Sequence, residues 1–169
     1  GEIYTKYDSV VKELIPHIPD EVAQQSIPIQ YGDILFAGSG ETAEEIGKCF
    51  AYIGTKEAFA GGDLIIMSPQ GVDSKYLGYS LNSVSACRQK AALGQGSSVV
   101  HIYITQLAKV ELPIPSTASE QRAIAAALSE VDTLVSALDK LIAKKRNIKR
   151  GAMQELLTGK TRLPGFSGE

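Results

Sequence analysis

The sequence has few of the residues on which several large classes of protein depend. It contains two histidines, His17 and His101, and two cysteines, Cys49 and Cys87, without a C-x-x-C spacing. Because a zinc site or a disulfide framework needs several such residues close together, neither is indicated. No motif places a histidine beside a nucleophile, so a Ser-His-Asp set is not indicated either. We expect both cysteines to be buried, reduced thiols in a cytoplasmic protein.

Long apolar runs are absent as well. No stretch approaches the roughly 18 residues needed to span a bilayer, and the first ten residues lack the apolar stretch of a signal peptide. The sequence therefore indicates neither membrane insertion nor secretion. Its 169 residues, 44% hydrophobic and 21% charged, are typical of a globular chain with one packed core.

The net charge of −2 hides an uneven distribution along the chain. Residues 1–117 carry eight Lys and Arg against thirteen Asp and Glu, whereas residues 118–162 carry nine against five. Glycine also becomes rare at the same point, until Gly151. We therefore predict three parts: a globular domain over 1–115, a long helix over 116–159 and a tail over 160–169.

The first part predicts an α+β domain. Short β-branched or aromatic runs bounded by Gly, Pro or Ser are typical of strands, and they cover residues 32–37, 58–67 and 99–104. Apolar spacings of three and four predict a helix over 74–89. An acidic turn after Thr42 predicts a short helix over 41–50. The elements alternate irregularly, so the topology stays open.

The second part predicts one helix of about 40 residues, on the order of 60 Å long. Thr117 and Glu120 fit a capping box at its start, with Ser116 or Ser119 as alternative caps, and Gly159 follows its end. Apolar residues recur along it at alternating steps of four and three, as in the heptad seam of a coiled coil. The residues proposed to face a partner helix are Ile124, Leu128, Val131, Leu134, Leu138, Leu141 and Ile148.

Other interpretations remain open for this helix and for its basic cluster. It could be a single surface helix of a monomer, although an uncovered apolar stripe of this length is an aggregation hazard. The basic cluster at 144–150 is either a solvated face favoured near a helix C-terminus or a phosphate contact.

Three short motifs suggest chemistry, but each is incomplete. Residues 36–40 (FAGSG) resemble the cofactor loop of S-adenosylmethionine-dependent methyltransferases, yet the chain has no D-P-P-Y or N-P-P-Y tetrapeptide, and a tight turn is the alternative. A P-loop would need glycine at Thr42 and a hydroxyl at Cys49. A nuclease site at 73–75 would need a strand where a helix is predicted. We expect no catalytic residue, cofactor or metal.

Polar loops flanked by glycine are the remaining candidates for a binding surface. They lie at residues 4–7, 38–42 and 94–101. Their hydroxyls, amides and charges suit contacts with base edges and phosphates, although ordinary hairpin and capping loops have the same composition. The candidate DNA-binding residues are Tyr4, Lys6, Tyr7, Ser39, Glu41, Thr42, Lys48, Arg88, Gln95, Ser97, Ser98 and His101.

Several motifs together resemble one family of proteins. Those of the second part are LPIP at 112–115, SEQRAIA at 119–125, LLTGK at 156–160 and RLPGF at 162–166. The combination looks like the conserved region of type I restriction-modification specificity subunits. The first part is similar to a target recognition domain of that family, through residues 1–7, 32–35, 39–43 and 95–101.

The resemblance implies a non-catalytic subunit that reads a short half-site of double-stranded DNA. The long helix would pair with a counterpart and dock methyltransferase subunits, and through them restriction subunits. Members of the family carry two recognition domains and two conserved helices, whereas this sequence shows one of each. We therefore expect half a subunit, either one that forms a homodimer or the C-terminal portion of a longer chain.

The acidic first part fits DNA binding less well. A domain with this charge should not bind strongly by counterion release, so its basic residues would have to gather on one face. These are Lys6, Lys12, Lys48, Arg88 and Lys90. Two other interpretations stay open, a fragment of an S-adenosylmethionine-dependent DNA methyltransferase and a coiled-coil adaptor without DNA contact.

Overall fold

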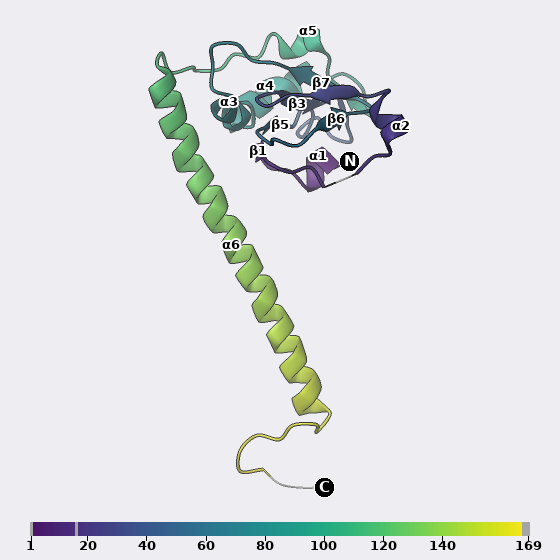
Figure 1. Cartoon of the computed structure of the whole chain (residues 1–169), viewed down its shortest axis with the longest axis vertical. Helices are drawn as coiled ribbons and strands as arrows, with labels where there is room; N and C mark the ends of the chain where they lie inside the picture. The colour runs from purple at the N-terminus through teal and green to yellow at the C-terminus, as the bar shows by residue number, and fades with distance from the viewer. Residues whose placement is uncertain (1, 16, 167–169) are drawn as a thin grey trace. The chain divides into compact units, whose positions relative to one another are not determined.

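The computed structural model of the protein describes residues 2–15 and 17–166 (Figure 1). The chain divides into two compact units, Gly1–Ala127 and Leu128–Glu169. The first unit contains small β-sheets and short helices, and the second contains most of one long helix. The fold is thus α+β with a long C-terminal helix, as the sequence predicted.

A four-stranded sheet in the order β1-β5-β3-β7 forms the centre of the first unit. The central strand β3 pairs antiparallel with both β5 and β7, whereas β1 runs parallel to β5. Both β3 and β5 are buried along their whole length, which shows that both faces of the sheet are covered. The strands are β1 (Val10–Val11), β3 (Ile34–Ala37), β5 (Cys49–Tyr52) and β7 (Leu64–Met67).

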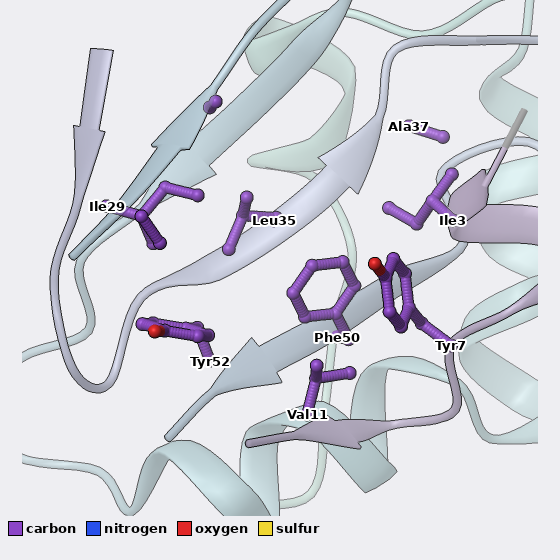
Figure 2. Close-up of a cluster of buried hydrophobic side chains, with 10 residues drawn as sticks. Ile3, Tyr7, Val11, Ile29, Leu35, Ala37, Phe50 and Tyr52 are labelled. Atoms are coloured by element: carbon purple, nitrogen blue, oxygen red, sulfur yellow. The ribbon is translucent and has the colours of Figure 1, made fainter. Parts of the chain in front are cut away.

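One face of this sheet packs against the N-terminal segment. Leu35 and Phe50 point into a buried cluster that also receives Tyr7 (Figure 2). The rings of Tyr7 and Phe50 lie 5.2 Å apart, and the Tyr7 hydroxyl accepts a hydrogen bond from the Ile15 amide at 2.9 Å. The other elements of the N-terminal half are α1 (Glu2–Thr5), α2 (Asp20–Ala23) and an antiparallel pair, β2 (Ile27–Ile29) with β6 (Ala58–Ala60).

Helix α3 (Ser74–Leu81) covers the opposite face of the sheet, where its Leu77 packs in a second buried cluster. The single helix predicted over 74–89 is wrong, because a separate helix α4 (Val84–Leu93) follows α3. Asn82 and Ser83 account for the break. The Asn82 side chain donates to the carbonyl of Cys49 at 2.6 Å, and the Ser83 side chain caps α4.

Two predicted strands are shorter than the sequence suggested. The run 58–67 forms two strands, β6 and β7, because Gly62 adopts the left-handed φ of +65° in the turn between them. The run 99–104 contains only β8 (Val100–His101), and a short helix α5 (Ile104–Leu107) begins after it.

The helix predicted over 41–50 is wrong. Residues 41–47 form bends and turns, and β5 begins at Cys49. From there, Phe50 and Tyr52 enter one buried cluster while Cys49 and Ala51 enter the other. This alternation has the period of a strand, which is incompatible with one apolar face of a helix.

The long helix α6 runs from Ala118 to Leu157, close to its predicted bounds. The Thr117 hydroxyl accepts a hydrogen bond from the Glu120 amide at 3.2 Å, and Gly159 beyond the end has a φ of +73°. The first ten residues of α6 belong to the first unit, where Gln121 and Ala125 are buried. Across residues 2–15 and 17–166, no helix has the length and apolar character needed to cross a membrane.

Candidate nucleic-acid interface

Two of the three predicted loops are joined by a small sheet. Strand β4 (Ser39–Gly40) pairs antiparallel with β8, so that Ser39 lies opposite His101. On its other side, His101 exchanges two backbone hydrogen bonds with Gln95, at 2.7 and 2.8 Å. Gln95 is exposed and His101 is half-buried. Backbone pairing therefore fixes the relative positions of the two Cα atoms from which these side chains extend.

The third predicted loop reaches the same sheet through Tyr4. Its hydroxyl donates a hydrogen bond to the carbonyl of Ser39 at 2.6 Å. Gly40 permits this approach, since a Cβ at that position would lie 2.7 Å from the Tyr4 hydroxyl oxygen. Lys48 adds a second link by donating to the Tyr4 carbonyl at 2.9 Å. The segments around Tyr4, Ser39 and His101 thus meet in one place.

The environment of Tyr4 keeps its hydroxyl protonated. Burial, followed by the negative charges of Glu45 and Asp63, raises the pKa of Tyr4 to about 12. The hydroxyl therefore stays protonated well above neutral pH and donates its hydrogen bond to Ser39.

Asp63 and Tyr103 belong to this region although the sequence analysis missed them. The Asp63 carbonyl accepts a hydrogen bond from the Gly38 amide at 2.8 Å, and its carboxylate lies 3.9 Å from the His101 ring. The Tyr103 ring stacks on His101 with 6.2 Å between centroids, and 53% of Tyr103 is exposed. Period-two spacing from His101 could have identified Tyr103, whereas Asp63 depends on a long-range pairing.

Other predicted residues fall into three groups. Glu41, Thr42, Ser97 and Ser98 are exposed in the loops next to β4 and β8. Lys6 is exposed but forms an ion pair with Glu2 at 2.7 Å. Arg88 is exposed on α4, and no hydrogen bond or ion pair among the described residues joins it to the other segments.

Two predictions about side chains of this region need correction. Tyr7, predicted to contact DNA, lies in the buried core against Phe50, so its side chain is not available to a ligand at the surface. Lys90 is fully buried and cannot join an exposed basic face. The five basic residues therefore cannot all lie on one exposed face, because Lys90 is buried in the core.

Three features of the described residues bear on catalytic or metal chemistry: the segment 36–40, the two cysteines and the grouping of possible metal ligands. Residues 36–40 pass from β3 through a bend at Gly38 into β4, and neither glycine among them has a positive φ. Burial raises the pKa of the Cys49 thiol to about 12, which leaves it unreactive, and Cys87 is half-buried instead of buried. No three His, Cys, Asp or Glu residues among those described are grouped to hold a metal.

The apolar seam of α6 is exposed within its own unit. The exposed fractions of Leu128, Val131, Leu134, Leu138, Leu141 and Ile148 lie between 41% and 59%. Ile124, near the start of the helix, is half-buried in the first unit. The side chains from Leu128 to Ile148 in this seam are therefore left uncovered by the described residues.

Comparison with known proteins assigns the chain to a family. The family model "Type I restriction modification DNA specificity domain" matches residues 11–150, which is most of the sequence. The chain belongs to this family. Its sequence resemblance to type I specificity subunits is thereby confirmed.

Relatives within the family have similar sequences and a similar fold. The chain is 33% identical over 135 residues to a protein of Methanocaldococcus jannaschii named as the MjaX type I restriction enzyme specificity subunit, and 26% identical over 140 residues to the MjaVIII specificity subunit of the same organism. These matches cover 75% and 82% of this chain. A crystal structure of the type I restriction-modification S subunit from M. genitalium matches 73% of the chain with a TM-score of 0.52 and 26% identity.

The matched part of each relative is much shorter than the relative itself. The chain covers 30% and 31% of the two M. jannaschii proteins and 32% of the M. genitalium chain. The chain thus spans about a third of the length of these relatives.

Proposed function

We propose that this chain is a sequence-reading, non-catalytic part of a type I specificity subunit, and that it binds one half-site in double-stranded DNA. The observation that carries the proposal is the meeting of three loops around Tyr4, Ser39 and His101. Each of these loops has the polar, glycine-flanked composition that suits contacts with base edges and phosphates. Membership of the DNA specificity family supports the same reading.

Base edges are the proposed targets of the exposed side chains on this surface. Gln95, Ser97 and His101 carry amide, hydroxyl and imidazole groups, which are able to donate and accept hydrogen bonds in a groove. The segment is held by backbone pairing, so the side chains are presented from a fixed frame. Such a frame favours selectivity because little order has to be created on binding.

Phosphate contacts are proposed to come largely from partner subunits. Within the first unit Lys48 is hydrogen-bonded to Tyr4 and Lys90 is buried, and residues 1–117 carry thirteen acidic against eight basic residues, so counterion release by this unit alone should be weak. Methylation and cleavage would likewise belong to methyltransferase and restriction subunits, which act in the cytoplasm where the DNA is. We propose the division of the chain into a recognition domain over 1–115, a spacer helix over 116–159 and a tail over 160–169.

The exposed seam of α6 is proposed to form a coiled coil with a partner helix. In a homodimer the partner would be α6 of a second copy, and in a longer chain it would be the second conserved helix. The same broad apolar face would dock methyltransferase subunits. A two-fold homodimer would read a symmetric site.

Methylome sequencing tests the proposal directly. A host carrying this chain with its methyltransferase should acquire methylated bases in one recurring motif, and a host with the methyltransferase alone should lack that motif. Two identical half-sites would indicate that one recognition unit works in duplicate. If the methylated motif is the same with and without the chain, the proposal is wrong and a coiled-coil adaptor without DNA contact becomes the better interpretation.

A further inference from the structure

Lys90 is a buried amine that DNA binding by surface loops does not use. The residue lies on α4 with no exposed surface, and its Nζ donates a hydrogen bond to the carbonyl of Gly47 at 2.7 Å. Among the described residues, none of the ion pairs includes Lys90. Burying an amine is costly unless its hydrogen bonds are made, so the contact with Gly47 is the feature that needs an explanation.

Gly47, whose carbonyl accepts this hydrogen bond, lies at the end of a turn. It has a φ of +68°, in the left-handed region that favours glycine. A Cβ at Gly47 would lie 3.0 Å from Cδ of Lys90 and 3.6 Å from the side chains of Ile102 and Leu107. The aliphatic stem of Lys90 therefore packs directly under the turn while its amine holds the turn's carbonyl.

The two neighbours of Gly47 lead to different parts of the candidate DNA interface. Ile46 is buried in a cluster with Val100 and Ile102, which flank His101. On the other side, Lys48 donates its hydrogen bond to the Tyr4 carbonyl. A displacement at Gly47 would thus reach both the β8 segment and Tyr4.

We propose that Lys90 is a positioning residue for the DNA-reading surface. It fixes the carbonyl of Gly47, and through Ile46 and Lys48 it holds the segments that carry His101 and Tyr4 at their mutual positions. The inference rests on the proposed function, because it concerns how accurately that surface discriminates between DNA sequences. It assigns Lys90 no contact with DNA.

The test is Lys90→Met in the full chain, assayed together with the methyltransferase. Binding is measured to the cognate site and to sites with one changed base pair. We expect the ratio of these affinities to fall about tenfold, as for the loss of one hydrogen bond to a charged group. The salt dependence of binding should stay the same, since no phosphate contact is lost. The thermal midpoint should fall by no more than a few degrees, because the cost of burying the amine is removed while the buried Gly47 carbonyl loses its hydrogen-bond donor.

Arg88→Met is the matched control, because Arg88 is an exposed cation on the same helix. If it contacts phosphate, this variant should bind all sequences more weakly and keep its discrimination. Amide hydrogen exchange gives a readout without DNA. In Lys90→Met the Lys48 amide, which donates to the Glu45 carbonyl at 3.0 Å, should exchange faster, while amides of β3 keep their protection.

The outcomes separate this inference from the proposed function. A wild-type chain without sequence preference would refute the proposed function. A wild-type chain that discriminates, together with a stable Lys90→Met variant of equal discrimination, would refute only the role of Lys90. If Lys90→Met does not fold, Gly47→Ala replaces it, since a side chain at this φ strains the same turn, and unchanged discrimination in that variant would refute the role as well.

Discussion

Gln121 on α6 accepts a hydrogen bond from the backbone amide of Asp73, 2.8 Å away in the turn before α3. The amide group of the same side chain donates to the carbonyl of Pro115 at 2.9 Å. Asp73 in turn caps α3 by accepting from the Tyr76 amide at 3.0 Å. One buried glutamine therefore links the start of the long helix, the connecting segment and the first turn of α3.

Replacing this glutamine should destabilise the first unit. Gln121→Ala leaves the Asp73 amide and the Pro115 carbonyl without their partner, and the expected loss is about 1–3 kcal/mol in the free energy of unfolding. Urea unfolding monitored by circular dichroism measures it. Arg122→Ala is the control, because Arg122 is exposed and should change stability by less than about 0.5 kcal/mol. Equal stability of the two variants would contradict the anchoring role.

The parts of the fold that depend on local sequence were predictable. The long helix is marked by the hydroxyl of Thr117, by a heptad pattern over many turns and by Gly159. Each of these signals lies within a few residues of the feature it specifies, so no tertiary knowledge is needed. The same holds for β3, a short apolar run bounded by glycines.

The sheet order and part of the interface could not be predicted in the same way. Residues 41–50 suggested a helix, yet Cys49 and Phe50 enter two different clusters on opposite faces of the sheet, and Ile46 packs in a third. Asp63 reaches His101 only because β7 pairs with β3, a contact that no local pattern reports. Tyr7 carries a hydroxyl and an aromatic ring, as residues that bind nucleic acids often do, and yet it packs in the buried core.

The hydroxyl of Tyr4 should contribute to stability in a pH-dependent way. Tyr4→Phe removes the hydrogen bond to Ser39 and should cost about 1 kcal/mol at neutral pH. Because the folded-state pKa is raised from 10.0 to about 12, the contribution is fully present below pH 10 and is lost as the pH rises toward 12. Urea unfolding at pH 8, 10 and 11 should therefore show the two proteins converging. A constant difference across this range would contradict the assigned pKa.

Gln95 and Lys6 should affect DNA binding in different ways. Gln95→Ala should relax the preference at one or two base pairs, with a cost of about 1–3 kcal/mol at those positions, because an exposed amide in a fixed frame reads base edges. Lys6→Ala should weaken binding to every sequence and lower the salt slope by about 1. Its exposed ion pair with Glu2 is too weak to prevent a phosphate contact. Competition binding with the methyltransferase present, over a series of salt concentrations, distinguishes the two, and the reverse pattern would exchange their roles.

The seam of α6 makes a prediction about assembly that needs no DNA. Leu138 and Leu141 are each about half exposed, and both lie on the heptad line proposed to face a partner helix. In the proposed helix pair, changing either to Asp would bury an unpaired charge, so we expect the variants to be monomeric at concentrations where the wild-type chain is expected to dimerise. Light scattering after size exclusion measures the mass. Ser136→Asp adds the same charge outside the seam and should leave the assembly intact. If all three variants keep the wild-type mass, the helix pairs through another face or not at all.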